Sequence, residues 1–379
     1  MSIRIPDHIR NLRPYVAGKP IEELAREQGL TRIVKLASNE NPLGVSPKAV
    51  AMVKATLEQA NRYVDPSAFD LVHAIAARHG LRPEQVVCGA GTDSLLAYTI
   101  AAFTSVDEEV LTAEGTFIGL YVNTRKLNRP LRTVPLNNYR FDLTALADAV
   151  TEKTKIIYLA NPNNPTGNIV TADEFEAFMK RVPEEVLVIL DEAYFNYAVE
   201  HDGYPNGLTY DYPNLIVTRT FSKDYGLGGM RVGFAAGPPT LIRELYKVKL
   251  PFEPSFPAQQ AAIAALMDDA FLERTLELNR RMMALMKDRF DELGLRYYGG
   301  QANFYLLVFP NEAFAVAFNN ACLKRGLIVR HVAPFGLPEA VRINTGTEEE
   351  TAFALDVIAD VYPRLVATFA NLKAEQIKG

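Results

Sequence analysis

Three side chains in this sequence could together bind and use an aldehyde cofactor. Lys223 lies in RTFSKDYGLGGMRVG, Arg231 follows eight positions later, and Asp191 lies upstream in ILDEAYF. A lysine amine can condense with a carbonyl carbon to form a Schiff base. Pyridoxal phosphate requires such a lysine and an acidic partner for its ring nitrogen, and a guanidinium can bind its phosphate through two parallel hydrogen bonds. If Lys223 and Asp191 meet over one ring, the protein catalyses amino-group chemistry.

Three further residues could contact the ring of such a cofactor. Tyr194 comes three positions after Asp191, and its hydroxyl could reach the phenolic oxygen of the ring. Asn164 lies in NPNNPTG, a strong turn signal whose amide could donate to the same oxygen. Phe117, in EGTFIGLY, has an aromatic face that could stack on the ring. These three residues also have plain structural interpretations as packing with a hydroxyl partner, a turn and core packing, and Asp191 could simply cap the next helix, so the hypothesis depends on their combination.

The phosphate of the cofactor would need its own binding groups. Thr220 and Ser222 place hydroxyls near the lysine, and Arg231 follows in GGMRVG. The run GAGTD, which contains Thr92 and Asp93, opens a predicted helix, and the free N–H groups at a helix start favour a phosphate. This run is not the GxGxxG pattern of a dinucleotide-binding fold, so nicotinamide binding is not expected.

Short apolar segments that alternate with helical patterns must position these residues. Between about 45 and 250 the segments are apolar throughout, which is typical of strands buried on both faces of a mostly parallel sheet. The interleaved helices favour an α/β doubly wound layer. Several candidate residues directly follow these strands, at the edge where ligands bind in open α/β sheets. The expected strands are 85–88, 109–111, 155–159, 186–190, 215–218 and 232–236.

The pattern changes from about residue 258. A long helix is expected over 258–293, because this segment contains few helix-breaking residues. The elements that follow indicate a smaller α/β domain, with apolar segments at 303–309, 327–330 and 340–344 and helices near 312–325 and 348–374. We therefore predict an N-terminal arm over 1–35, a large domain over 36–265 and a small domain over 266–379.

Composition excludes several classes of protein. The 379 residues are 48% hydrophobic and 22% charged, and the net charge of −5 provides no basic field for nucleic acid or an anionic membrane. Two cysteines, Cys88 and Cys322, are too few for a disulfide framework. The first residues lack the apolar core of a signal peptide, and no run is apolar enough to span a bilayer. We therefore expect a cytoplasmic protein, and we expect no metal site.

The chain resembles the fold-type-I aminotransferases that depend on pyridoxal phosphate, and within them the histidinol-phosphate aminotransferase branch. The motifs that carry the resemblance are LRPY, LASNENPLG, NRYVDP, GAGTDSL, NPNNPTG, DEAY, RTFSKDYGLGGMRVG and VRINTGT, which extend over nearly the whole chain. The resemblance implies a large, doubly wound, mostly parallel sheet domain and a smaller C-terminal α/β domain. It also implies pyridoxal 5'-phosphate as the cofactor.

The resemblance assigns roles around the cofactor ring. Lys223 would bind the cofactor covalently, and Asp191 would pair with the ring nitrogen. Asn164 and Tyr194 would contact the ring oxygen, and Phe117 would take the stacking position.

The resemblance also assigns contacts with the phosphate and with the substrate. Tyr63 would reach the phosphate in the site of a neighbouring subunit, which implies a homodimer. The phosphate would be held by the backbone of Thr92 and Asp93 and by Thr220, Ser222 and Arg231. The residues that match the substrate-anion site of the family are Tyr15, Asn39, Arg330 and Arg342. Two guanidiniums could bind a substrate phosphate, or one could bind an α-carboxylate.

Three positions depart from the usual pattern of the family. Ser94 stands where an acidic residue is usual, and DYGLGG follows Lys223 where a version with alanine is more common. Neither change affects cofactor binding. The segment after Lys249 reads LPFEPSFPAQQ rather than an Asn-rich sequence, and we expect it to influence substrate choice.

The resemblance implies a ping-pong reaction in which Lys223, once released from the cofactor, moves the α-proton of the amino donor. The expected pairs are glutamate with 2-oxoglutarate and histidinol phosphate with imidazole-acetol phosphate. Two alternatives stay open: an aminotransferase for Phe, Tyr or another amino acid, and a decarboxylase of a phosphorylated amino acid that uses the same cofactor. A cofactor-sensing regulator would need a DNA-binding segment, and residues 1–35 are too short to provide one.

Overall fold

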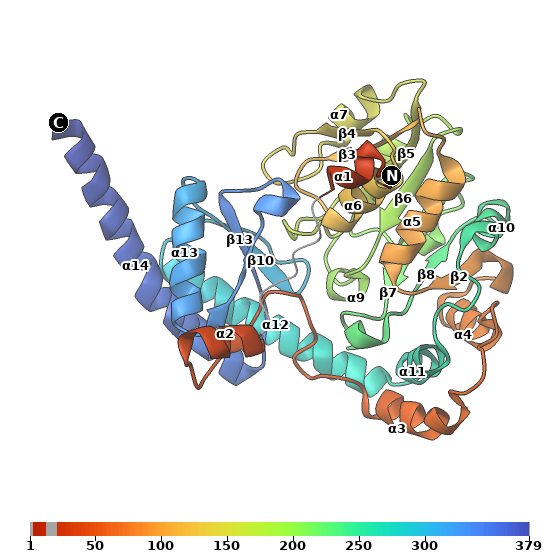
Figure 1. Ribbon diagram of the computed structural model, residues 1–379, viewed down its shortest axis with the longest axis horizontal. Coiled ribbons are helices and arrows are strands. Elements are labelled where there is room, and N and C mark those ends of the chain that lie inside the picture. Colours follow the sequence, from red (N-terminus) through yellow and green to blue (C-terminus); the bar gives the residue numbers. More distant parts are fainter. Residues whose placement is uncertain (1–2, 13–20, 379) are drawn as a thin grey trace.

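A seven-stranded sheet forms the centre of the larger part of the molecule (Figure 1). The computed structural model describes residues 3–12 and 21–378, and the strand order of this sheet is β2-β8-β7-β6-β5-β3-β4. β8 runs antiparallel to both of its neighbours and the other pairs are parallel, which confirms the expected mostly parallel α/β sheet. The strands are β2 (Val86–Gly89), β3 (Glu109–Ala113), β4 (Leu131–Val134), β5 (Thr154–Ala160), β6 (Leu187–Asp191), β7 (Leu215–Thr220) and β8 (Gly233–Ala236).

The edge strand β4 was not predicted. Of its residues, only Val134 is buried, while Leu131 and Thr133 are half-buried and Arg132 is exposed. A strand with so little burial lacks the apolar run by which the other strands were predicted.

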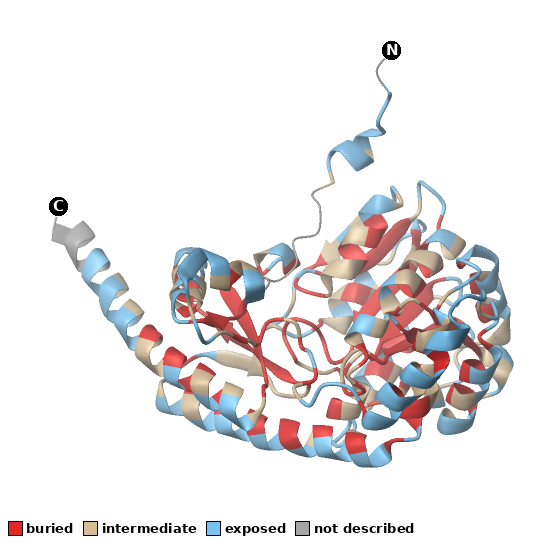
Figure 2. Ribbon diagram, turned by 60° about the horizontal axis from the view of Figure 1, so that its bottom comes forward, coloured by how far each residue is buried: buried red, intermediate tan, exposed pale blue. Residues whose placement is uncertain are grey.

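Helices cover both faces of the large sheet, and Figure 2 shows the strands buried between them. Along β5, Ile156 and Tyr158 pack on one face, whereas Ile157 and Leu159 pack on the other. Successive side chains of a strand point to opposite faces, so the side chains on each face must be apolar or must form hydrogen bonds. The first face carries α5 (Thr92–Phe103), α6 (Ile118–Lys126) and α10 (Pro239–Val248); the second carries α7 (Leu143–Asp148) and α8 (Ala172–Met179), with α3 (Pro47–Thr56), α4 (Phe69–His79) and α11 (Phe256–Leu266) against β2 and β8.

The rest of the molecule is arranged around a smaller antiparallel sheet of order β12-β13-β10-β9. Its core contains Phe290, Phe318, Ile343 and Ile358. The elements here are β9 (Tyr297–Gly299), β10 (Phe304–Val308), β12 (Arg330–His331), β13 (Ala340–Asn344), α12 (Asp269–Glu292), α13 (Glu312–Lys324) and α14 (Glu348–Lys378). No helix within residues 3–12 and 21–378 has the length and apolar character needed to cross a membrane.

Part of the N-terminal segment packs against the smaller sheet and its helices. β1 (Val34–Lys35) pairs in parallel with β11 (Leu327–Ile328), and Leu36 joins the same hydrophobic core. Before it lie α1 (Asp7–Arg10) and α2 (Ile21–Gln28), and Leu24 of α2 packs against Ile328. The expected arm over 1–35 therefore supplies a strand as well as helices.

The expectation of one helix over 258–293 is wrong, because the chain turns at Met267 and Asp268 between α11 and α12. Asp268 leaves the helical conformation (φ −110°, ψ 59°), and its Oδ2 accepts a hydrogen bond from the Ser46 hydroxyl at 2.5 Å. This contact comes from a distant segment, and neither glycine nor proline marks the turn. α12 then runs toward the smaller sheet (Figure 1), and the division into domains at residues 265 and 266 stays a prediction.

A buried ion pair joins the ends of β6 and β7. The Nε and Nη2 atoms of Arg219 donate to Glu192 Oε2 at 2.9 and 2.6 Å, and the guanidinium packs on the Phe195 ring, 3.4 Å from its centroid. Buried charges are tolerated only when they are paired and hydrogen-bonded. Because Asp191 precedes Glu192 and Lys223 follows Arg219 in a short loop, this pair fixes the separation of two strand ends that carry candidate site residues.

Replacing Arg219 with methionine should lower the free energy of unfolding by about 3–5 kcal/mol, because Glu192 would remain buried without its cation. Arg280→Met is a matched control, since Arg280 pairs with Glu200 at 2.8 Å on the exposed surface. That change should alter the free energy of unfolding by less than about 1 kcal/mol. Urea unfolding followed by circular dichroism measures both. Equal stabilities for the two variants would contradict the role assigned to the buried pair.

Candidate active site

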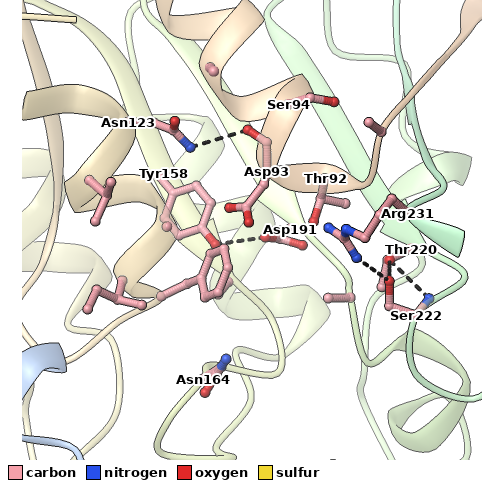
Figure 3. Close-up of a pocket in the computed structure, with 18 of the residues that line it drawn as sticks. Thr92, Asp93, Ser94, Asn123, Tyr158, Asn164, Asp191, Thr220, Ser222 and Arg231 are labelled. Carbon is pink, nitrogen blue, oxygen red and sulfur yellow. Dashed lines mark hydrogen bonds between the residues drawn. The ribbon is translucent and has the colours of Figure 1, made fainter. Parts of the chain in front are cut away.

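Ten of the predicted site residues line one cavity of about 840 Å³ at the carboxyl edge of the large sheet (Figure 3). They come from the ends of β6 and β7, the loop after β5, the start of α5 and the residue before α6. Ligands bind at this edge in open α/β sheets. The ten are Thr92, Asp93, Phe117, Asn164, Asp191, Tyr194, Thr220, Ser222, Lys223 and Arg231.

Asp191 ends β6 with its carboxylate in the wall of the cavity. Tyr158, on the neighbouring strand β5, donates to Asp191 Oδ2 at 2.8 Å (Figure 3). Asp191 Oδ1 is buried and has no hydrogen-bond partner among the described residues. Burial raises the pKa of Asp191 to about 6. A carboxylate with one enclosed and unbonded oxygen suits a cationic nitrogen placed against that oxygen.

Lys223 lies in the loop after β7 and also lines the cavity. Its Nζ donates to the backbone oxygen of Ser38 at 3.2 Å and lies 5.8 Å from the centroid of the Tyr194 ring. Burial, and to a smaller extent the charge of Arg342, lowers the pKa of Lys223 to about 8. Part of this amine is therefore unprotonated near neutral pH, and that form attacks carbonyl carbons.

The side chains of Arg231, Ser222 and Thr220 form a polar cluster beside the start of α5, here called the seat around Arg231. Arg231 Nη1 donates to Ser222 Oγ at 3.3 Å, and Thr220 Oγ1 donates to the same oxygen at 3.0 Å. α5 begins at Thr92, and the first N–H groups of a helix have no partner within it. A Cβ on Gly91 would lie 2.6 Å from Arg231 Nη2, so only glycine lets the guanidinium approach the helix start this closely. A guanidinium, two hydroxyls and a helix N-terminus together suit a phosphate.

Asn39 and Arg342 are hydrogen-bonded to Tyr194 and Asn164, two of the residues that line the cavity. Asn39 Nδ2 donates to the hydroxyl of Tyr194 at 2.7 Å. Arg342, on β13, donates through Nη1 to Asn164 Oδ1 and through Nη2 to the backbone oxygen of Ala37 at 2.7 Å. The smaller sheet is thus connected directly to the cavity of the larger one.

Arg330 and Arg342 lie side by side in the smaller sheet. They are paired residues on β12 and β13, and both are buried. Their Cζ atoms lie 5.9 and 5.8 Å from the centroid of the Phe335 ring. Like charges directly opposite one another on neighbouring strands repel, and an anionic ligand would relieve that repulsion.

Besides Asn39, Arg330 and Arg342, one further predicted site residue among the described residues, Tyr63, does not line the cavity. Tyr63 is 86% exposed, and its ring stacks on that of Phe252 with centroids 4.5 Å apart. Tyr15 lies outside the described residues. The expectation that Tyr63 serves the site of a neighbouring subunit stays a prediction.

Three features of the cavity were not predicted. The hydrogen bond from Tyr158 to Asp191 was missed, although a tyrosine inside the otherwise apolar run of β5 needs a partner for its hydroxyl. Asp93 was expected to act through its backbone, but its side chain lines the cavity, and burial raises the pKa of that carboxyl. Asn123 of α6 donates to the backbone oxygen of Asp93 at 3.2 Å, a contact that depends on how α5 and α6 pack together.

Two of the sequence features expected to depart from the family pattern contribute to the lining of the cavity. Ser94 lines it, and so does Leu250 from the LPFEPSFPAQQ segment. In the same segment Glu253 accepts hydrogen bonds from the Tyr98 hydroxyl at 3.0 Å and from Ala90 N at 3.3 Å. This segment therefore borders the cavity on the side of α5.

The residues present fit the expected cofactor, pyridoxal phosphate. The seat around Arg231 matches a phosphate, and the unbonded oxygen of Asp191 matches a protonated ring nitrogen. The amine of Lys223, with its lowered pKa, matches an aldehyde carbon. These three groups differ in chemistry and line the same cavity, so each supports the interpretation independently.

Comparison with known proteins agrees with this geometry. Residues 31–358 match the family described as aminotransferase class I and II. The chain is 40% identical over 346 residues to a protein of Carboxydothermus hydrogenoformans named histidinol-phosphate aminotransferase 2, covering 91% of this chain and 95% of that protein. It is 42% identical over 346 residues to a protein of the same name from Hydrogenovibrio crunogenus, covering 90% and 92% of the two chains.

Solved structures show the same similarity. The histidinol-phosphate aminotransferase of Sinorhizobium meliloti, determined in complex with pyridoxal-5'-phosphate, matches with a TM-score of 0.88 and 29% identity over 96% of this chain and 99% of that one. An aspartate aminotransferase variant from Thermus thermophilus shares the fold, with a TM-score of 0.83 at 22% identity over 95% of this chain and all of that one. With its fold, its cavity and the match over residues 31–358 in agreement, the chain belongs to the class I and II aminotransferase family.

Proposed function

We propose that this protein uses pyridoxal phosphate to transfer an amino group between the glutamate/2-oxoglutarate pair and the histidinol phosphate/imidazole-acetol phosphate pair. The observation that carries the proposal is the meeting of Lys223, the unbonded oxygen of Asp191 and the seat around Arg231 in one cavity. The choice of histidinol phosphate is supported by 40% identity over 91% of the chain to a protein with that name.

Pyridoxal phosphate, when bound, acts as an electron sink for the amino acid joined to it. Asp191 would hold positive charge at the ring nitrogen, and Tyr158 keeps the carboxylate oriented through its 2.8 Å hydrogen bond. Asn164 and Tyr194 would bond the ring oxygen, and Phe117 would pack on the ring face. The phosphate would be held by the backbone of Thr92 and Asp93 and by Thr220, Ser222 and Arg231.

Lys223 would attach the cofactor and, when released, carry the α-proton of the substrate. Its pKa of about 8 leaves an unprotonated fraction that can accept a proton near neutral pH. The backbone oxygen of Ser38, 3.2 Å from Nζ, then holds the protonated amine in place. The same lysine would serve the donor half and the acceptor half of the reaction in turn, which gives ping-pong kinetics.

Arg330 and Arg342 would bind the anionic groups of the substrates. Guanidiniums bind carboxylates and phosphates through paired hydrogen bonds. Both arginines are buried, and Arg342 is bonded to Asn164 in the cavity wall, so an anion held here would lie next to the cofactor. Asn39, through Tyr194, and Tyr15 would complete this part of the site.

We also propose a cytoplasmic homodimer in which Tyr63 reaches the phosphate seat of the neighbouring subunit. Support comes from exposed apolar surface next to the cavity: Tyr63 stacks on Phe252, and Leu250, which is 59% exposed, also lines the cavity. Exposed apolar surface of this kind marks an interaction site. The cysteines Cys88 and Cys322 are free and buried, which fits a reducing compartment.

Lys223→Ala should lose nearly all turnover and the visible absorption band of the lysine-bound cofactor, because the change removes the amine proposed to bind the cofactor; the other lysine that lines the cavity, Lys126, belongs to α6 and not to the loop after β7. Lys48→Ala is the control, since Lys48 also donates to a backbone oxygen, that of Met267, at 2.7 Å outside the cavity. It should keep both properties. Spectra and steady-state rates measured with added pyridoxal phosphate test the pair, and full activity in Lys223→Ala would refute the assignment.

Asp191→Asn should reduce kcat by about 100- to 1000-fold, because it removes a preorganised charge from the site. It should also stabilise the apoprotein. The pKa of Asp191 is raised from 3.8 to about 6 in the fold, so its ionisation destabilises the native apoprotein as pH rises through this window. Above it, the Asn variant should gain up to about 3 kcal/mol relative to the native chain. Unfolding of both apoproteins at pH 4 and pH 7 checks this, and a stability difference that does not change with pH would contradict it.

Amino donors compared with 2-oxoglutarate as acceptor should show a kcat/KM for histidinol phosphate about 100-fold above that for phenylalanine, because the paired arginines favour a substrate with a second anionic group. Tyrosine and leucine complete the panel. A preference for phenylalanine or tyrosine would establish the aromatic alternative. Carbon dioxide release without any oxo acid would indicate the decarboxylase.

A further inference from the structure

The loop that carries Lys223 is tied to two other segments of the cavity wall. One is residues 38–41, which lie before α3, and the other is residues 194–196, where α9 (Phe195–Ala198) begins. On the cavity side, Lys223 Nζ donates to the Ser38 backbone oxygen at 3.2 Å, and Asn39 donates to the Tyr194 hydroxyl at 2.7 Å. These bonds alone leave the lysine loop and the α9 segment unconnected to each other.

A second layer of hydrogen bonds behind the cavity makes the missing connection through Asp224. Asn196 Nδ2 donates to Asp224 Oδ2, and Asn41 Nδ2 donates to the backbone oxygen of Asp224 at 2.8 Å. Asn41 is also bonded to Thr275 of α12 at 3.1 Å, which anchors it to a long helix. Each of the three segments is therefore bonded to the other two, in a closed triangle.

Asp224 is a charged group in an enclosed place. It is 5% exposed, its Oδ1 accepts from Tyr225 N at 3.1 Å, and it is not among the described residues that line the cavity. Burial raises the pKa of Asp224 to about 6, and the bond from Asn196 opposes that rise. Arg219 is the cation that acts on it, and Arg219 is already paired with Glu192 at 2.6 Å. Hydrogen bonds to an ionised acceptor are shorter and stronger than neutral ones, so this carboxylate holds Asn196 firmly.

The loop is also held by close backbone packing at Gly226. Gly226 has φ +70°, and a Cβ there would collide with the backbone oxygen of Gly44. The loop therefore rests directly on the segment that follows residues 38–41. This contact and the bonds to Asp224 together restrain the loop.

We propose that Asp224 is a positioning residue for the aminotransferase reaction, because it fixes where Lys223 lies relative to Tyr194 and Asn39. The inference rests on the role proposed for Lys223. The ε-amine must meet a reacting carbon at a defined point, and a misplacement of about 1 Å can reduce the rate by about 100-fold. Asp224 touches neither cofactor nor substrate and acts through the lysine beside it.

Asn196→Ala is the principal test, because Asn196 is only half-buried and its truncation removes the bond to the Asp224 carboxylate. In the holoenzyme kcat should fall by about 10- to 100-fold with little change in KM. The pH at which the visible band of the lysine-bound cofactor titrates should shift, because the nitrogen of Lys223 would move relative to the charged groups around it. Asp224→Ala should match these effects, and Asp224→Asn, which keeps an acceptor oxygen for Asn196, should recover most of kcat.

Asn214→Ala is the matched control for stability. Asn214 is buried just before β7 and donates to the backbone oxygens of Pro183 and Val186 at 3.3 and 2.8 Å. Its truncation should lower Tm and leave kcat and the titration of the band unchanged. This separates a loss of stability from a displacement of the lysine.

The outcomes distinguish this inference from the function on which it rests. Turnover in Lys223→Ala would overturn the proposed function itself. The positioning role alone would be overturned by a different pair of results. In that case Lys223→Ala is inactive, whereas the Asn196→Ala holoenzyme has an unshifted band and a kcat within about twofold of native. If Asp224→Ala does not fold, Asn196→Ala and Asp224→Asn decide the question.

Discussion

The carboxylate of Asp191 is enclosed in the wall of the cavity, and one of its oxygens has no hydrogen-bond partner among the described residues. An unbonded and buried polar atom destabilises a fold unless a ligand provides its partner. Asp191 can be kept in this state because β5 and β6 hold it rigidly and because Tyr158 bonds its other oxygen. The large sheet thus supplies a fixed negative charge at the point where a cationic ring nitrogen would lie.

The other requirements of the chemistry are distributed over both parts of the molecule. The large sheet provides the seat around Arg231 and the loop of Lys223, whereas the smaller sheet provides Arg330 and Arg342. The bond from Arg342 to Asn164 connects the pair of arginines proposed to bind substrate anions to the cavity wall. An amino-acid substrate has an anionic group and a reacting nitrogen at a fixed distance, so a site that spans two sheets can hold both ends at once.

The departures from the family pattern are placed consistently. Ser94 and the segment that contains Leu250 and Glu253 border the cavity, and Asp224, the first residue of the run DYGLGG, lies behind it. The carboxylate, lysine and arginine expected to contact the cofactor are unaltered. The groups proposed to bind the cofactor therefore lie at the centre of the site, and the segments singled out as departures lie around them.

The apolar strands, their mostly parallel arrangement and the chemical character of the residues at their ends could all be predicted from the order of the amino acids. These features follow from local periodicity and residue type, which reflect burial on both faces of a strand. Tertiary structure alone decided the turn at Met267 and Asp268, the edge strand β4, the bond from Tyr158 to Asp191 and the triangle around Asp224. Each of these depends on contacts between segments far apart in the chain, and the pattern of neighbouring residues has no information about which distant groups packing will bring within hydrogen-bond reach.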